Sequence, residues 1–152
     1  MYSNILVPVD GSETSALGLA EAIKLAKNQG AALRLLHVVA ELIFYSPYAI
    51  GYDFSKLVES LRESGRITLR DGEASARSAG VKVDSILIEV MGDQTGSLIL
   101  KQAKEWHADL IVMGTHGRRG VRRMVMGSDA EYVVRHTPIP VLLVRHPDPV
   151  KE

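Results

Sequence analysis

Short apolar segments alternate along the chain with longer segments that carry apolar residues at helical spacing. The apolar segments cover residues 5–9, 33–39, 81–90, 110–113 and 141–144. Apolar runs of this length are typical of strands that are buried on both faces of a sheet. Between them, helices are predicted over residues 12–30, 53–79 and 128–136, and in the segment that carries Ile99, Ala103 and Trp106.

Several residues predict where the helices begin and end. Ser12 is a suitable N-cap for the first helix, and Gly30 a suitable end. Gly80 closes the second helix, whose interior Gly65 and Gly72 are expected to weaken. Residues 40–52 contain aromatic residues together with proline and glycine, which predicts a long loop that acts as a lid or as a partner contact.

Five strands with four helical connections predict a single α/β domain over residues 1–146, followed by a tail over residues 147–152. Right-handed crossovers favour a doubly wound, five-stranded parallel sheet with helices on both faces. Such sheets bind ligands beyond the carboxyl ends of their strands, where the strand order reverses. Asp10 follows the first strand and a glycine-rich loop follows the fourth, so both are expected at one crevice if these strands are neighbours.

The composition restricts the class of partner. The 152 residues contain no cysteine, which excludes disulfides and thiolate chemistry and fits a cytoplasmic protein. The net charge of zero argues against nucleic-acid and acidic-membrane partners. The chain begins without the pattern of a signal peptide, and no apolar run approaches the roughly 20 residues of a membrane-spanning helix, so we expect neither.

The loop from Gly114 to Ser128 combines glycines with four arginines and leads into a helix. Glycine lets backbone N–H groups approach an anion, and a helix N-terminus favours phosphate, so the loop predicts a phosphate cradle. Its spacing matches neither a Walker A loop nor a dinucleotide-binding fingerprint. Plainer interpretations stay open: Ser128-Asp-Ala-Glu131 as a capping box, the arginines as a solvated face, and Asp10 as a turn residue.

The chain resembles the ATP-binding universal stress proteins. The resemblance is carried by Ile5-Leu-Val-Pro-Val-Asp-Gly-Ser12, Leu36-His-Val38, Ala108-Asp-Leu-Ile-Val-Met-Gly-Thr-His-Gly117, Gly114-x2-Gly117-x9-Gly127-Ser128 and Pro140-Val-Leu-Leu-Val144. It implies an adenine nucleotide α-hydrolase-like sheet of order 3-2-1-4-5, with ATP between the first and fourth strands. It also implies a cytoplasmic homodimer in which residues 141–144 pair with their copy.

The same resemblance implies roles for individual residues. Pro8, Val9 and Asp10 would line the adenosine end, with Asp10 near the ribose or a nucleotide-bound Mg²⁺, and Val38 would contact adenine through its backbone. The ribose and phosphates would lie against the glycine loop, at Met113, Gly114, His116, Gly117, Arg118, Gly127, Ser128, Asp129 and Ala130. Asp129 and Ala130 depart from the family pattern, because small, apolar or hydroxyl residues are more usual there. Asp129 would bring a negative charge near the phosphates.

These observations predict a nucleotide-binding regulator that has at most slow ATP hydrolysis and no catalytic residue of its own. His37 lies in a strand pattern and is expected to be a packed or hydrogen-bonded core residue. One alternative is an ATPase or phosphotransferase that uses His116 or Asp10. Another is a nucleotide-free dimeric interaction module in which Asp129 has spoiled the pocket.

Overall fold

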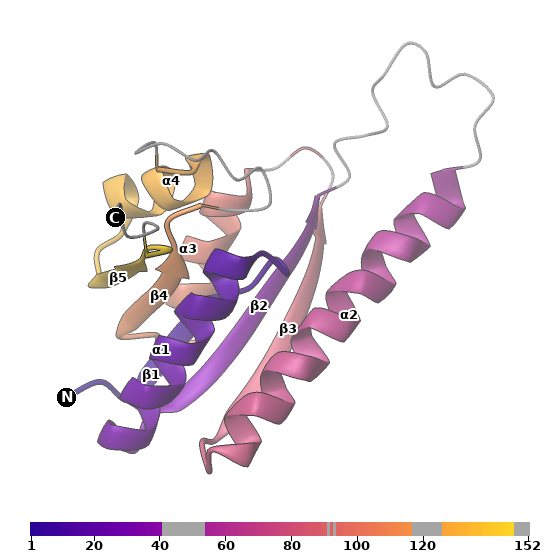
Figure 1. The fold of residues 1–152 in the computed structure, drawn as a ribbon. Helices are drawn as coiled ribbons and strands as arrows, with labels where there is room; N and C mark the ends of the chain where they lie inside the picture. Colours follow the sequence, from indigo (N-terminus) through magenta and orange to yellow (C-terminus); the bar gives the residue numbers. More distant parts are fainter. Residues whose placement is uncertain (41–53, 91, 93, 117–125, 148–152) are drawn as a thin grey trace, which may run out of the picture.

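The computed structural model describes residues 1–40, 54–90, 92, 94–116 and 126–147 (Figure 1). Its five-stranded parallel sheet has the order β3-β2-β1-β4-β5, which confirms the predicted architecture. The strands are β1 (Asn4–Pro8), β2 (Ala32–Ala40), β3 (Val83–Val90), β4 (Leu110–Gly114) and β5 (Val141–Val144). The predicted loop over residues 40–52 lies almost entirely outside the described residues, as does most of the predicted tail.

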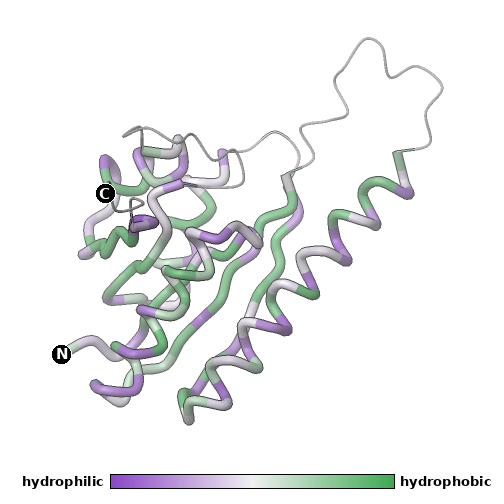
Figure 2. Tube along the Cα trace, viewed as in Figure 1, coloured by the Kyte–Doolittle hydropathy of each residue, from purple (hydrophilic) through white to green (hydrophobic). Residues whose placement is uncertain are grey.

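Four helices cover the sheet on both faces. They are α1 (Glu13–Gln29), α2 (Phe54–Ser78), α3 (Thr95–Glu105) and α4 (Ser128–His136). Alternate strand residues face α1 and α2 on one side, as Ile5 and Val7 do, or α3 and α4 on the other, as Leu6 does. These three residues of β1 are completely buried, as expected for a central strand with apolar residues on both faces. Figure 2 shows the green, apolar segments along the strands of the sheet. No helix of the described residues combines the length and apolarity needed to cross a membrane.

The first helix begins and ends where the sequence predicts. Ser12 is its N-cap, and the Ser12 hydroxyl accepts a hydrogen bond from the Ser15 amide at 3.2 Å. Gly30 ends the helix in the left-handed conformation, with φ of 70°, and donates its amide to the Ala26 carbonyl. Glycine adopts this conformation without the steric penalty that a side chain would add.

Gly65 and Gly72, which are expected to weaken α2, are both buried within one continuous helix of 25 residues. A Cβ atom on Gly72 would lie 2.7 Å from the Leu35 Cδ1 atom, and one on Gly65 would lie 2.5 Å from the His37 Cδ2 atom. The two glycines therefore allow α2 to pack closely on β2. Close packing against the sheet offsets their low intrinsic helix propensity.

An ion pair joins the exposed side of α2 to the edge strand β3. The Arg62 guanidinium donates to both carboxylate oxygens of Glu89 on β3, with its Nη2 atom 2.8 Å from Oε2, and it also pairs with Glu59. Hydrogen bonds to Arg62 hold the pKa of both carboxyl groups below its ordinary value. Both carboxyl groups are exposed to solvent, so these ion pairs contribute little to the free energy of unfolding.

We predict that Gly65→Ala destabilises the protein. Alanine improves helix propensity by about 1 kcal/mol, but overpacking against a rigid imidazole costs about 1–3 kcal/mol. Chemical unfolding should therefore show a net loss of free energy of unfolding. The matched control, Ser64→Ala, changes an exposed neighbour and should stay within about 0.5 kcal/mol of the wild type. A Gly65→Ala protein more stable than the wild type would contradict the packing described here.

Candidate functional site

The reversal of strand order places a crevice at the carboxyl edge of the sheet, next to β1. The chain moves outward from β1 to β2 and β3, then returns to place β4 on the opposite side of β1. The paired register of β1 with β4 ends at Leu6↔Ile111, whereas that of β1 with β2 continues to Pro8↔Leu36. Strands β1 and β4 therefore separate toward their carboxyl ends, where α/β sheets bind their ligands.

The turn after β1 is fixed by its own hydrogen bonds. One carboxylate oxygen of Asp10 accepts the Ser12 amide at 2.8 Å, and the Asp10 amide donates to the Ser15 hydroxyl at 3.3 Å. Gly11 takes a φ of 82°, which suits glycine. The interpretation of Asp10 as a turn residue is therefore confirmed. The same turn holds Asp10 at the crevice, so a turn role and a ligand role are compatible.

The end of β4 packs directly on the first turn of α1. A Cβ atom on Gly114 would lie 2.8 Å from the carbonyl carbon and oxygen of Thr14. The Thr14 hydroxyl also donates to the His116 carbonyl, just beyond β4. Gly114 is thus required by backbone packing whether or not a ligand binds. A bulky residue there would disturb the fold, so it would not be a selective test of nucleotide binding.

The start of α4 differs from the predicted capping box. The N-cap is Gly127, with φ of −60° and ψ of 152°, and it supplies no side-chain hydrogen bond. Ser128 is the first helical residue instead, so its exposed hydroxyl is not in the capping position. The Gly127 amide donates to the Thr115 carbonyl at 2.8 Å, which ties this helix start to the end of β4. An N-terminus without a side-chain cap, held at the crevice, is suited to bind an anion.

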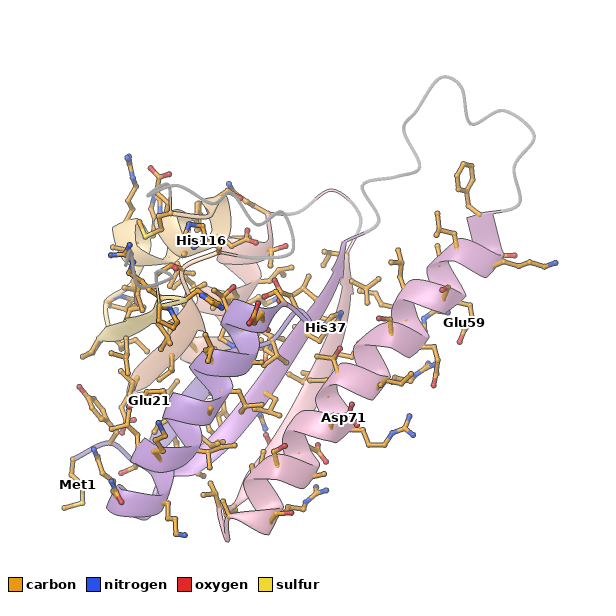
Figure 3. The ribbon with its side chains drawn as sticks, viewed as in Figure 1. Met1, Glu21, His37, Glu59, Asp71 and His116 are labelled. Atoms are coloured by element: carbon orange, nitrogen blue, oxygen red, sulfur yellow. The ribbon has the colours of Figure 1, made fainter. Side chains whose placement is uncertain are left out.

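A cavity of about 250 Å³ lies beside these groups and is lined by Thr115, His116, Met126 and Arg145. Figure 3 places His116 near α4, above the end of β4. The His116 Nδ1 atom is 2.9 Å from the Thr115 hydroxyl, and its Nε2 atom is buried without a hydrogen-bond partner among the described residues. Thr115, Met126 and Arg145 were not predicted as site residues. Arg145 follows the last strand directly, which is the signal that would have indicated it.

Those of the other predicted residues that the structure describes lie at the same edge of the sheet. Val9, Met113 and Ala130 are buried, whereas Pro8 and Val38 are half-buried. Asp129 occupies the second position of α4 and is half-buried. Gly117, Arg118 and the other arginines of the loop lie outside the described residues. Among the residues that the structure describes, no group of three or more histidine, aspartate or glutamate side chains is arranged to hold a metal ion.

Comparison with known proteins agrees with this geometry. Residues 1–145 match the universal stress protein family. The universal stress protein MJ0531 of Methanocaldococcus jannaschii is 34% identical over 147 residues, which cover 97% of this chain and 84% of that protein.

Two solved structures have the same fold. A universal stress family protein from Burkholderia pseudomallei is 38% identical, with a TM-score of 0.77 over 94% of this chain and 96% of that chain. The universal stress protein from Archaeoglobus fulgidus in complex with dAMP is 23% identical, with a TM-score of 0.68 over 94% of this chain and 98% of that chain. The sequence match over nearly the whole length and the shared strand order together show that the chain belongs to the universal stress protein family.

Proposed function

We propose that this protein binds ATP, or a closely related adenine nucleotide, at the carboxyl edge between β1 and β4 and acts as a regulator. The observation that carries the proposal is the start of α4. The N-cap of α4, Gly127, supplies no side-chain hydrogen bond. The Gly127 amide donates to the Thr115 carbonyl at the end of β4. The first-turn N–H groups and the helix dipole favour phosphate at this position, so a phosphate can bind there without a basic side chain.

The remaining groups suit the rest of a nucleotide. Val38 would contact the base through its backbone, and Asp10 would lie near the ribose or a bound Mg²⁺. The Archaeoglobus fulgidus relative, which was solved with dAMP, supports an adenine nucleotide as the ligand class. We place this function in the cytoplasm, where a nucleotide ligand is available.

A magnesium ion would be held chiefly by the nucleotide. Mg²⁺ in proteins is commonly bound through one or two carboxylates together with substrate phosphates and water. Asp10 and Asp129 are the carboxylates predicted for this site, and the described residues include no group of three or more side chains arranged to hold a metal ion. These carboxylates therefore fit a Mg²⁺ ion that arrives with ATP. Through that ion, Asp10 would help to orient the phosphates.

A regulatory role is favoured over an enzymatic one. The Asp10 carboxylate already accepts the Ser12 amide, and the His116 Nδ1 atom is within hydrogen-bond distance of Thr115. The remaining His116 nitrogen, Nε2, has no hydrogen-bond partner among the described residues, but it is buried away from solvent water. A general base must instead reach the proton of an attacking water. We therefore expect ATP turnover well below about 1 s⁻¹, the lower range of dedicated enzymes.

The last strand is the proposed dimer contact. Strand β5 lies at one edge of the described sheet. Its even-numbered residues face β4, since the Pro140 and Val144 carbonyls accept the amides of Ile111 and Thr115. The backbone groups of Val141 and Leu143 therefore point away from the sheet. A second copy of this strand, paired antiparallel, would satisfy them and remove an exposed edge.

The nucleotide site is tested by Gly127→Asp, with Gly127→Asn as the uncharged control. Both side chains are good N-caps, so neither should lower the thermal midpoint. The added carboxylate would repel a phosphate about 5 Å away by roughly 3 kcal/mol at an effective dielectric of 20. Calorimetry with ATP and Mg²⁺ should show binding at least about tenfold weaker in Gly127→Asp than in Gly127→Asn.

The wild-type titration decides among the alternatives. Absence of binding to ATP, AMP or cyclic AMP would favour the nucleotide-free interaction module. Steady turnover above about 1 s⁻¹ in the same samples would favour the enzyme. Equal affinity of the two Gly127 variants would place the phosphates elsewhere.

The natural charge in the first turn of α4 should also oppose phosphate. We predict that Asp129→Asn strengthens ATP binding by about twofold to tenfold, within the range of a partly screened charge pair. AMP, which carries fewer phosphates, should gain less. The control Glu131→Gln makes the same charge change two residues further along the helix, where Glu131 pairs with Arg135 at 2.7 Å. A larger gain in the control than in Asp129→Asn would contradict this placement.

The dimer contact is tested by Leu143→Pro. Proline removes the outward N–H group of this residue and leaves the groups that bond to β4. Light scattering should give a dimeric mass for the wild type and a monomeric mass for the variant. Leu143→Val keeps the N–H group and should remain dimeric. A Leu143→Pro dimer would assign the contact to another surface.

A further inference from the structure

The ladder of hydrogen bonds between β1 and β2 stops one bond short of the position where the parallel pattern would continue. The Val9 amide donates to the Leu36 carbonyl at 2.8 Å, and in a parallel pair the next bond would run from the Val38 amide to the Val9 carbonyl. That bond would add a Val9↔His37 pair to the register, which instead ends at Pro8↔Leu36. The Val9 carbonyl has a different partner: the His37 Nδ1 atom, 2.8 Å away.

The imidazole ring of His37 is buried and packed against α2. It is 4% exposed and lies near the carboxyl end of β2, on the side that α2 covers (Figure 3). Gly65 of α2 packs on the opposite edge of the ring, where a Cβ atom would lie 2.5 Å from Cδ2 and 2.8 Å from Nε2. A carbonyl oxygen only accepts hydrogen bonds, so the Nδ1 atom must carry the proton. Helix α2 therefore holds the His37 ring so that its Nδ1 proton points at the Val9 carbonyl, at the end of β1.

This arrangement decides where the Val38 backbone groups point. Even-numbered residues of β2 direct their N–H and C=O groups toward β1, as the Leu36 carbonyl does, whereas the Leu33 amide bonds to Lys82 on the β3 side. Beyond Val9 the chain leaves the sheet into the Asp10 turn. The Val38 amide and carbonyl thus face the crevice at the end of β1, next to the groups proposed to bind the nucleotide.

We infer that His37 is a positioning residue for the nucleotide base. By donating to the Val9 carbonyl, it ends the β1–β2 ladder and leaves the Val38 amide to pair with the base. This inference rests on the proposed nucleotide-binding function. Without the imidazole proton, the Val9 carbonyl would take the Val38 amide as its partner, and the ladder would close over the base-binding position.

Two substitutions at His37 separate this role from simple core packing. Asparagine places an N–H donor at the position of Nδ1, whereas leucine fills the space without any donor. ATP binding by calorimetry should weaken about tenfold in His37→Leu, the effect of one lost hydrogen bond, and should stay within about threefold of the wild type in His37→Asn. The control Leu87→Ala loosens the contact under Gly65 without touching Val9 and should bind ATP as the wild type does.

Amide hydrogen exchange gives a second readout, which a merely structural role would not change. In the nucleotide-free wild type, the Val38 amide should exchange faster than the Leu36 amide, and ATP should slow it. In His37→Leu it should already be slow without ATP, because the ladder has closed. A Val38 amide that is protected in the nucleotide-free wild type would overturn the inference, even if His37→Leu failed to fold.

The outcomes also separate this inference from the proposed function. Wild-type protein that binds no adenine nucleotide would overturn both. Wild-type protein that binds ATP, together with a folded His37→Leu protein of equal affinity, would overturn the role of His37 alone. Equal losses of affinity in His37→Leu, His37→Asn and Leu87→Ala would assign His37 to core packing and would likewise overturn it.

Discussion

The site depends on a close backbone contact between α1 and the end of β4. A Cβ atom on Gly18 would lie 3.2 Å from the Gly114 amide nitrogen, and one on Gly114 would lie 2.8 Å from the Thr14 carbonyl. Both neighbours are backbone atoms, so neither can rotate aside as a flexible side chain would. The contact fixes the first turn of α1 against β4 at the point where β1 and β4 separate. The edge that collects the proposed ligand-binding groups therefore has a defined geometry before any ligand binds.

Hydrogen bonds connect the residues around this contact to α1, β5 and α4, and a second set lies on the other side of β1. The Thr14 hydroxyl donates to the His116 carbonyl, the Thr115 amide donates to the Val144 carbonyl at 3.0 Å, and Gly127 bonds to Thr115. The segment after β4 is thus bonded at once to α1, to β5 and to the start of α4. On the other side of β1, His37 and Gly65 link the Val9 carbonyl to α2. Groups proposed to hold the phosphates are therefore physically joined to the proposed dimer strand, which is the connection that a nucleotide-dependent regulator requires.

The sequence predicted the parts of the structure that are set by local pattern. Apolar runs identified the five strands, and Ser12 and Gly30 were placed correctly because capping depends on neighbouring residues. Helix propensity predicted the local cost of Gly65 and Gly72 but not their packing role, which is a contact with a strand distant in the chain. The predicted capping box failed by one position, since Gly127 rather than Ser128 is the N-cap. The bond from His37 to Val9 spans 28 residues and depends on strand register, which no local pattern reveals.

The central claim is that an adenine nucleotide binds at the carboxyl edge between β1 and β4. The most direct test is to follow the backbone amide resonances of the wild-type protein by NMR while ATP and Mg²⁺ are added. The largest shift changes are expected at Asp10, Val38, Gly114, Gly127 and Ser128, which belong to separate segments that meet at this edge. Changes confined to the outer side of α2 and β3, or no changes at millimolar ATP, would contradict the central claim.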